Sequence, residues 1–431
     1  MANYKLNEQM VAGMSEGDKE TILSLYLHRC LTPSLIVKHL YRIDGIQEEI
    51  ANHRLDAMIL DHLIEPVPYG SSEEALFLTQ FGVRTVVSLF GDRLKKLYKP
   101  GSQNTALPTC FDLKMHPANI NHQMHLNQFG LEFEDYARGD AAYTYYDEKF
   151  MPPASDFIMP DGMIVLPERI LFLEMDMGTE RVKRLAQKWN SYRMFLNSPK
   201  AFYEKKPITM FFLLAGVKRL SYRQKSVMRS LMTYLNGRVN GEFEAYIETP
   251  EMCHEILQTR YLSAGTEMAG AEKSVLDCLR AKYGFTVTQP PFLKTLGFPG
   301  AYYIKRLNTQ GKIDVIGSRP QEFILDLWLD RRFSLFQNIT NIERNEKVMR
   351  ERVGREVPYL LVVSSPIWAK RIPSITKTAI SETIFFTTPD RMSTKSDWCR
   401  ALFQIDQLKN MNHFKDDSLL ETVHELRMAK L

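Results

Sequence analysis

The sequence lacks the signatures of several common enzyme classes. It contains no GxxxxGK[ST] loop, which excludes a P-loop ATPase, and no GxGxxG follows a predicted strand. The HExxH pattern of metalloproteases is also missing. The five cysteines lie far apart without a CxxC pair, which predicts free thiols in a reducing cytoplasm and no zinc site.

The sequence also lacks a long hydrophobic run. The longest apolar stretches, such as residues 210–217, are too short to cross a bilayer, and no secretory pattern opens the chain. We therefore expect a cytoplasmic protein without a membrane partner. With 431 residues, 44% of them hydrophobic, the chain is long enough for two or three domains. A net charge of +4 permits nucleic-acid binding without requiring it.

The first 92 residues predict a winged helix-turn-helix. Helices are expected over residues 18–29 and 47–63, with a short helix between them that is capped by Thr32 and begins at Pro33. After residues 66–70 a strand is expected over 75–79, and a further helix starts near Phe81. This order is typical of DNA-binding domains, so duplex DNA is the predicted partner.

The charges of this region leave the DNA-binding interpretation open. The third helix and the wing carry several acids, which would repel phosphates, and a docking or dimerisation domain is the alternative. The basic end of the region is a second candidate for phosphate contact, or else a solvated linker. The candidate DNA-binding residues are Arg42, Asn52, His53, Arg54, Arg93, Lys95 and Lys96.

The chain after the linker at residues 93–116 predicts two tandem α/β units, over residues 117–262 and 263–431. In the first, helices over 120–138 and 179–196 enclose a strand at 170–175, and strands at 208–214 and 245–248 follow. The second repeats this order, with strands at 312–316, 323–328, 358–363 and 384–387. A Thr-Pro pair closes each unit, at Thr249 and Thr388.

Acids in both units predict a core like that of the PD-(D/E)xK nucleases, which are also called restriction-endonuclease-like. Asp161 and Glu174 fit the two acids that would share Mg²⁺ or Mn²⁺, and Asp176 projects to the same side as Glu174. Asp314 and Asp326 are the expected counterparts in a more degenerate second unit.

The lysine of that nuclease pattern is replaced by Asp176. Lys188 on the next helix is the candidate catalytic cation, beside the candidate metal ligands Asp161, Glu174 and Asp176. Two simpler interpretations remain open: Pro-Asp-Gly and Asp176 are turn residues, and His122 and His125 belong to a polar helix face.

Several segments together resemble the replication-relaxation family of Firmicutes plasmids and mobile elements. They are His122 with Asn127, Pro160-Asp161, the Glu-x-Asp-x-Gly-Thr-Glu segment from Glu174 to Glu180, and Lys188 with Tyr192. The resemblance covers about residues 15–215. The resemblance implies plasmid DNA binding and a role in replication, relaxation or mobilisation. It also implies that an aspartate at position 176 is typical of the family and is not a lost lysine.

Three functions follow as hypotheses. The first is a DNA-binding protein of a plasmid or mobile element. The second is a metal-dependent endonuclease or nickase. The third is a regulator or assembly scaffold whose partner is a second copy of the chain or another replication or mobilisation protein.

Overall fold

The computed structural model describes residues 13–41, 45–69, 73–97, 107–138, 143–151, 157–198, 206–235, 243–262, 266–298, 300–316, 319–355, 357–376, 384–405 and 411–413. The chain divides into two compact units, one of residues 1–180 and 197–218, the other of residues 181–196 and 219–431. Both units combine helices with strands, so the protein has a mixed α+β fold, as the sequence predicts.

The first unit opens with helices around a small antiparallel sheet of order β1-β3-β2. Its elements are α2 (Glu16–His28), β1 (Cys30–Leu31), α3 (Pro33–His39), α4 (Glu48–Leu60), β2 (Ile64–Tyr69), β3 (Glu73–Leu78) and α5 (Gln80–Leu97). Thr32 caps α3 by accepting a hydrogen bond from the Leu35 amide, and Pro33 occupies the first turn, so both predictions are confirmed.

Two predictions for this region are wrong. The helix expected to reach Leu63 ends at Leu60, because His62 adopts a positive φ of 56° and turns the chain toward β2. Residues 66–69, where no strand was predicted, continue β2 and pair with β3. The strand tolerates Pro66 and Pro68 because β2 lies at the edge of the sheet, where one side of the backbone needs no partner.

The rest of the first unit is a helix and a sheet. The elements are α6 (Cys110–Leu113), α7 (Pro117–Ala137), β4 (Thr144–Asp147), β5 (Gly162–Val165), β6 (Ile170–Asp176) and β7 (Ile208–Leu214). Strands β4, β5 and β6 are antiparallel neighbours, and β6 pairs in parallel with β7. Every residue of β6 and β7 is buried, which explains their almost continuous apolar sequence.

The predicted linker takes part in this unit. Helix α5 extends to Leu97, past the expected boundary at residue 92. Leu113 is buried in the same core as Ile22 and Leu31, together with Leu131 from α7. The N-terminal helices and α7 therefore share one hydrophobic core within the first unit.

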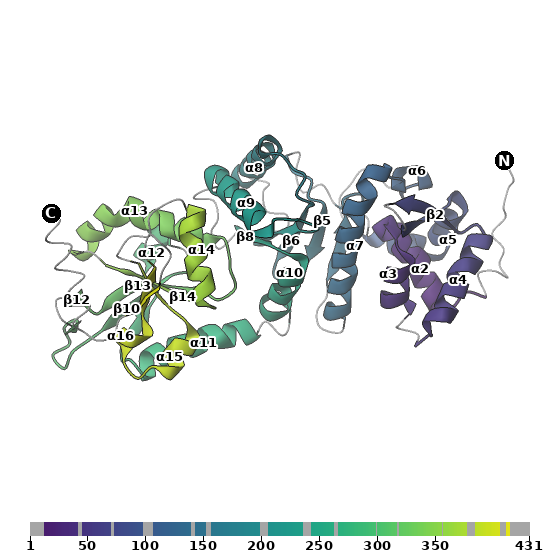
Figure 1. The fold of residues 1–431 in the computed structure, drawn as a ribbon. Coiled ribbons are helices and arrows are strands. Elements are labelled where there is room, and N and C mark those ends of the chain that lie inside the picture. Colours follow the sequence, from purple (N-terminus) through teal and green to yellow (C-terminus); the bar gives the residue numbers. More distant parts are fainter. Residues whose placement is uncertain are drawn as a thin grey trace. The chain divides into compact units, whose positions relative to one another are not determined.

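The second unit contains a seven-stranded sheet of order β17-β16-β15-β14-β13-β10-β9, with β13, β14 and β15 parallel (Figure 1). Its elements are α8 (Val182–Asn197), α9 (Leu220–Leu235), β8 (Phe243–Glu248), α10 (Pro250–Ile256), η3 (Leu257–Tyr261), α11 (Thr266–Ala281), β9 (Phe285–Thr288), α12 (Pro291–Thr295), β10 (Tyr302–Arg306), β11 (Val315–Ile316), β12 (Arg319–Pro320), β13 (Glu322–Trp328), α13 (Ser334–Val353), β14 (Tyr359–Val363), α14 (Pro366–Thr376), β15 (Ile384–Thr387), α15 (Pro389–Thr394), α16 (Trp398–Ala401), β16 (Phe403–Ile405) and β17 (Met411–His413).

The strands of the two α/β regions pair in the same way. Strand β10 is antiparallel to β13, which is parallel to β14, just as β5 is antiparallel to β6, which is parallel to β7. Thr249 and Thr388 cap helices α10 and α15, each followed by a proline in the first turn. These features support the predicted internal repeat.

One strand of the second region was predicted in the wrong place. Only Val315 and Ile316 of residues 312–316 are in a strand, and they pair with β12 in a separate two-stranded sheet. The main sheet instead uses β9 and β10, which the sequence analysis did not predict. Among the helices that the structure describes, none is long and apolar enough to cross a membrane.

Candidate functional site

The acids of the first unit gather where β5 begins and β6 ends. Gly162 pairs with Leu173, so Asp161, one residue earlier, stands opposite Glu174, one residue later. Glu174 and Asp176 project to the same side of β6 because they are two residues apart on one strand. Both are buried, whereas about a quarter of the Asp161 side chain (24%) is exposed.

Asp161 is held by the backbone of β6 and by a histidine. Its Oδ2 accepts a hydrogen bond of 2.7 Å from the Met175 amide. The Nε2 atom of His122 lies 3.5 Å from the same oxygen and 3.1 Å from the Met175 carbonyl oxygen. His122 therefore lies beside the acidic edge, the site formed by Asp161, Glu174 and Asp176.

Asp176 closes a turn at the end of β6. Its Oδ1 accepts a hydrogen bond of 2.9 Å from the Gly178 amide. Gly178 has a φ of +75°, which favours glycine, and a Cβ there would contact Val217. The hydrogen bond from the Gly178 amide to Asp176 agrees with the interpretation of Asp176 as a turn residue.

The described residues include no group of three or more His, Cys, Asp or Glu side chains that could hold a metal ion. The carboxylates of Asp161 and Asp176 each accept a hydrogen bond from a backbone amide. The predicted Mg²⁺ or Mn²⁺ site therefore stays a prediction. The candidate cation Lys188 lies on α8 in the second unit and is half-buried.

Asn127 lies on the same helix as His122 and joins α7 to the N-terminal helices. Its buried Nδ2 donates to the carbonyl oxygens of His28 (2.9 Å) and Cys30 (2.5 Å). Gln123, one turn earlier, donates to both Asn127 and Asp147. One end of α7 thus contacts the acidic edge, while its middle holds the end of α2.

Buried titratable groups surround this junction. Burial raises the pKa of Asp147 to about 6, against the opposing effect of the Arg29 guanidinium 3.9 Å away. Burial lowers the pKa of His28 to about 4, although a hydrogen bond with Asn127 opposes the shift. His28 is therefore neutral in the folded protein near pH 7.

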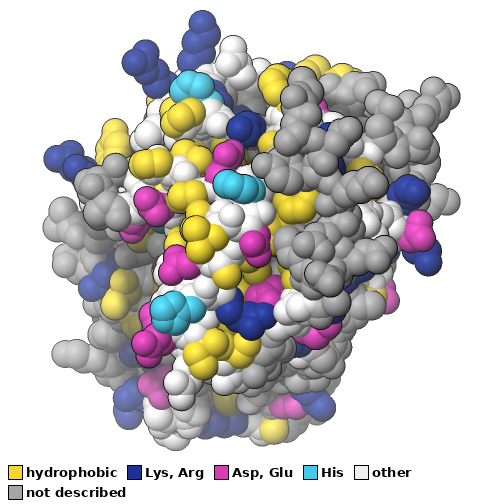
Figure 2. Space-filling view, turned by 90° about the vertical axis from the view of Figure 1, so that its right-hand side faces the viewer, with side chains coloured by type: hydrophobic (Ala, Val, Ile, Leu, Met, Phe, Trp, Pro, Cys, Tyr) yellow, Lys and Arg dark blue, Asp and Glu magenta, His cyan; other side chains and the backbone are white. Residues whose placement is uncertain are grey.

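The candidate DNA-binding residues do not share one environment. Arg54 is bound to the Asp18 carboxylate, which also accepts from Tyr41 (2.7 Å), so Arg54 supports the helix packing. Asn52 and His53 are exposed on α4. Figure 2 shows the face where α4 lies, and there acidic, basic, histidine and apolar side chains are interspersed among the described residues.

The remaining candidates are at the end of α5 or outside the described residues. Lys95, Lys96 and Arg93 are exposed on α5. Arg93 lies 3.9 Å from Glu20, and Lys95 lies 3.9 Å from Asp92. Arg42 lies outside the described residues.

Strand register corrects the predicted alignment of the two α/β regions. The Ile170 amide donates to the Pro207 carbonyl, and the Ile324 amide donates to the Pro358 carbonyl in the same way. Ile170 and Ile324 are therefore equivalent. Counting along each strand, Asp176 corresponds to Asp330, and Glu174 corresponds to Trp328 instead of Asp326.

Asp314 is likewise no counterpart of Asp161. It lies beside the small sheet and forms an ion pair with Arg306 at 2.7 Å. The predicted pairing of Asp314 with Asp326 failed because sequence spacing alone does not show which strands are neighbours.

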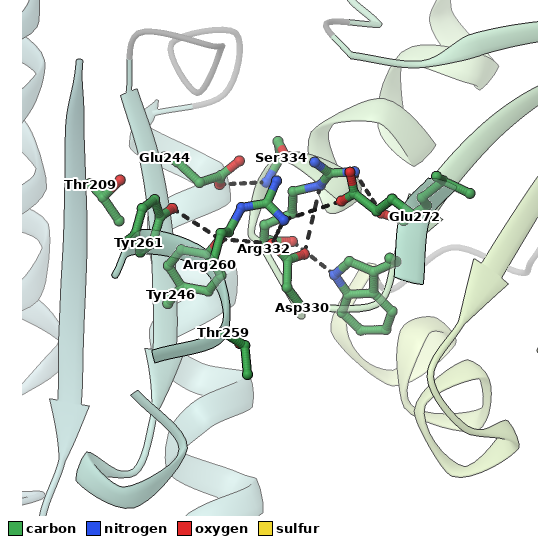
Figure 3. A network of polar contacts seen from close by, with 12 residues as sticks. Thr209, Glu244, Tyr246, Thr259, Arg260, Tyr261, Glu272, Asp330, Arg332 and Ser334 are labelled. Carbon is green, nitrogen blue, oxygen red and sulfur yellow. Dashed lines mark hydrogen bonds and ion pairs between the residues drawn. The ribbon is translucent and has the colours of Figure 1, made fainter. Parts of the chain in front are cut away.

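The equivalent edge of the second region is a network of ion pairs. Asp330 is fully buried, lies 2.6 Å from Arg260 and accepts from the Tyr246 hydroxyl at 2.9 Å (Figure 3). Arg332 reaches Asp326 at 3.1 Å and lies 3.9 Å from Asp330. Although burial disfavours its charge, these two carboxylates raise the pKa of Arg332 above the ordinary value.

Comparison with known proteins supports the family resemblance for part of the chain. Residues 23–208 match the model of the replication-relaxation family. The match covers less than half of the 431 residues and includes His122, Asn127, Asp161, Glu174 and Asp176. Neither the curated proteins nor the solved structures that were compared gave a significant match. The family description points to a role in replication or relaxation.

Proposed function

We propose that the protein binds duplex DNA of a plasmid or mobile element and acts in its replication, relaxation or mobilisation. The observation that carries this proposal is the replication-relaxation match over residues 23–208. The order of α2, α3 and α4, followed by the antiparallel hairpin β2–β3, supports a winged helix-turn-helix as the docking domain.

A binding assay across a salt series tests this function. Fluorescence anisotropy with labelled duplex and junction DNA should show affinity that falls linearly with salt on a log–log plot, because bound phosphates release counterions. The absence of salt-dependent binding to every duplex and junction tested would reject the proposal.

A second candidate function is a Mg²⁺- or Mn²⁺-dependent nickase with a PD-(D/E)xK-like core. The placement of Asp161 opposite Glu174 favours it, because the chemistry requires two acids near one phosphate. Supercoiled plasmid incubated with Mn²⁺ should then be nicked by the wild type and not by Asp161→Asn. Asp314→Asn is the matched control, with the same change in charge outside that edge. An intact plasmid with the wild type would reject this candidate.

A third candidate is a scaffold in which α4 docks on a second copy of the chain. The exposed Leu60 (78%) and Ile50 (49%) lie among the acids of α4, which suits a protein contact better than a phosphate contact. Light scattering should show a dimer for the wild type and a monomer for the double variant Ile50→Ser, Leu60→Ser. A wild type that stays monomeric at high concentration would exclude it.

A further inference from the structure

Positive charge is concentrated in one part of the chain. Residues 181–241 contain fourteen lysines and arginines and a single acid, Glu204. That segment therefore has a net charge of +13, and since the whole chain has +4, the remaining residues together have −9. The near-neutral total hides this segregation.

Helices α8 and α9 carry much of this charge within the second unit. Neither helix contains an Asp or a Glu. Both pack against strand β8: the Tyr192 ring lies 6.4 Å from the Phe243 ring, and Gln224 donates to the Ile247 carbonyl at 2.8 Å. Figure 1 draws the two helices next to each other beside β8.

Each helix buries one apolar face. Leu185 and Trp189 of α8 and Val227 and Leu231 of α9 are fully buried. Outside that face, Val182, Met194, Leu220 and Tyr222 are exposed.

The solvent side of the helices combines positive charge with polar groups. Lys183 and Arg193 on α8 and Arg219 at the start of α9 are exposed. Gln187 and Thr233 are exposed hydrogen-bonding side chains on the same helices. Lysine, arginine, glutamine and threonine are the residue types that contact phosphate oxygens in DNA complexes.

We propose that α8 and α9 form the surface that contacts the phosphates of duplex DNA. The inference rests on the proposed function and adds a phosphate-contacting surface outside the winged helix-turn-helix. Phosphate contacts dominate affinity for DNA, so a surface without acids is favoured over the acid-rich α4. Residues 219–235 lie beyond the part of the chain that matches the replication-relaxation family.

Two triple variants with equal charge change test the proposal. The first is Lys183→Gln, Arg193→Gln, Arg219→Gln on α8 and α9. The matched control is Lys273→Gln, Lys294→Gln, Lys395→Gln elsewhere in the second unit, where all three side chains are also exposed. Affinity for a labelled 30-base-pair duplex is measured by anisotropy over a salt series, and circular dichroism checks that both variants fold.

The first variant should bind at least about tenfold more weakly at 0.1 M salt, with a salt slope smaller by up to about 2.7, because each lost phosphate contact contributes about 0.9. The control variant should retain wild-type affinity and slope. An equal loss in the control variant, or no loss in the first, overturns the proposal while DNA binding itself stands.

Wild-type protein that binds no DNA would reject the proposed function, and this surface with it. An assay with lipid vesicles tests whether this surface binds a membrane instead of DNA. If phosphatidylglycerol vesicles bind the wild type more tightly than duplex at equal salt, and the first variant loses that binding, the surface is a membrane contact and the proposal is overturned.

Discussion

The ends of β6 and β13 occupy equivalent positions in the two α/β regions and differ in chemistry. At the first, Asp161 and His122 lie near the surface beside the end of β6, and about a third of the His122 side chain (34%) is exposed. At the second, Asp330 is completely buried between Arg260 and Tyr246. The position of Glu174 is taken by Trp328, which packs edge to face on Phe336 and Trp368.

The equivalent acids Asp176 and Asp330 are both buried but have different partners, a backbone amide for Asp176 and an arginine for Asp330. Buried carboxylates need partners, and in the second region arginines provide them within the fold. Asp330 and Asp326 with their arginines thus form a structural network. In the first region, Asp161 keeps a partly exposed side chain that a ligand can approach.

The largest expected effect is the loss of the buried acid in the second region. Asp330→Ala should lower the free energy of unfolding by about 3–5 kcal/mol, because it leaves Arg260 and Arg332 without their shared carboxylate. Asp161→Ala should cost about 1.5 kcal/mol, the low end of the range for a hydrogen bond to a charged group, because the carboxylate is partly exposed. Urea unfolding measures the free energy of unfolding of both variants. Equal losses would contradict the difference expected between Asp330 and Asp161.

A smaller effect is expected from the amide that joins α7 to α2. Asn127→Ala should cost about 2–3 kcal/mol, because the buried carbonyls of His28 and Cys30 lose their donor. Gln128→Ala, on the exposed side of the same helix, is the control and should cost less than about 0.5 kcal/mol. Similar thermal shifts for the two variants would show that Asn127 does not stabilise this junction.

The first unit should also be sensitive to acid through His28. Its pKa in the folded state, about 4, is below the unfolded value of 6.5, so its contribution to stability is present above pH 6.5 and is lost as the pH falls toward 4. We expect a loss of about 2 kcal/mol between pH 7 and pH 5.

His28→Gln should remove this part of the pH dependence. Asp147 has a raised pKa of about 6 and therefore acts in the opposite direction, losing its contribution as the pH rises toward 6. Asp147 is present in both proteins, so the difference between them isolates His28. Parallel stability curves from pH 7 to pH 5 would be incompatible with a buried neutral histidine.

The smallest expected effect is that of Asp161→Asn. The amide oxygen still accepts from Met175, so the free energy of unfolding should change by less than about 1 kcal/mol. A melting temperature close to that of the wild type would qualify this variant as a probe of the acidic edge. A large destabilisation would show that the Asp161 charge supports the fold, as that of Asp330 does.

Elements with strong local signals could be predicted from the sequence. Strand β7 extends over the predicted residues 208–214, because seven consecutive buried positions produce an unmistakable run. The capped starts at Thr32, Thr249 and Thr388 were also predictable, since a threonine followed by proline defines a helix start locally.

Contacts between distant segments were not predictable in this way. His122 is 39 residues from Asp161, and only the packing of α7 brings the two side chains to 3.5 Å. Arg54 was predicted from the sequence as a DNA-binding residue, yet it forms an ion pair with Asp18 from another helix. The charge segregation over residues 181–241 was visible in the sequence and was missed because the total charge was used.

The sequence by itself determined the long buried strands, such as β7, and the capped starts of several helices, because hydrophobic periodicity and capping act over a few neighbouring residues. Only the tertiary structure decided which acid stands opposite which, because strand register depends on hydrogen bonds between distant segments. The same residue type, aspartate, is therefore partly exposed at position 161 and locked between arginines at position 330.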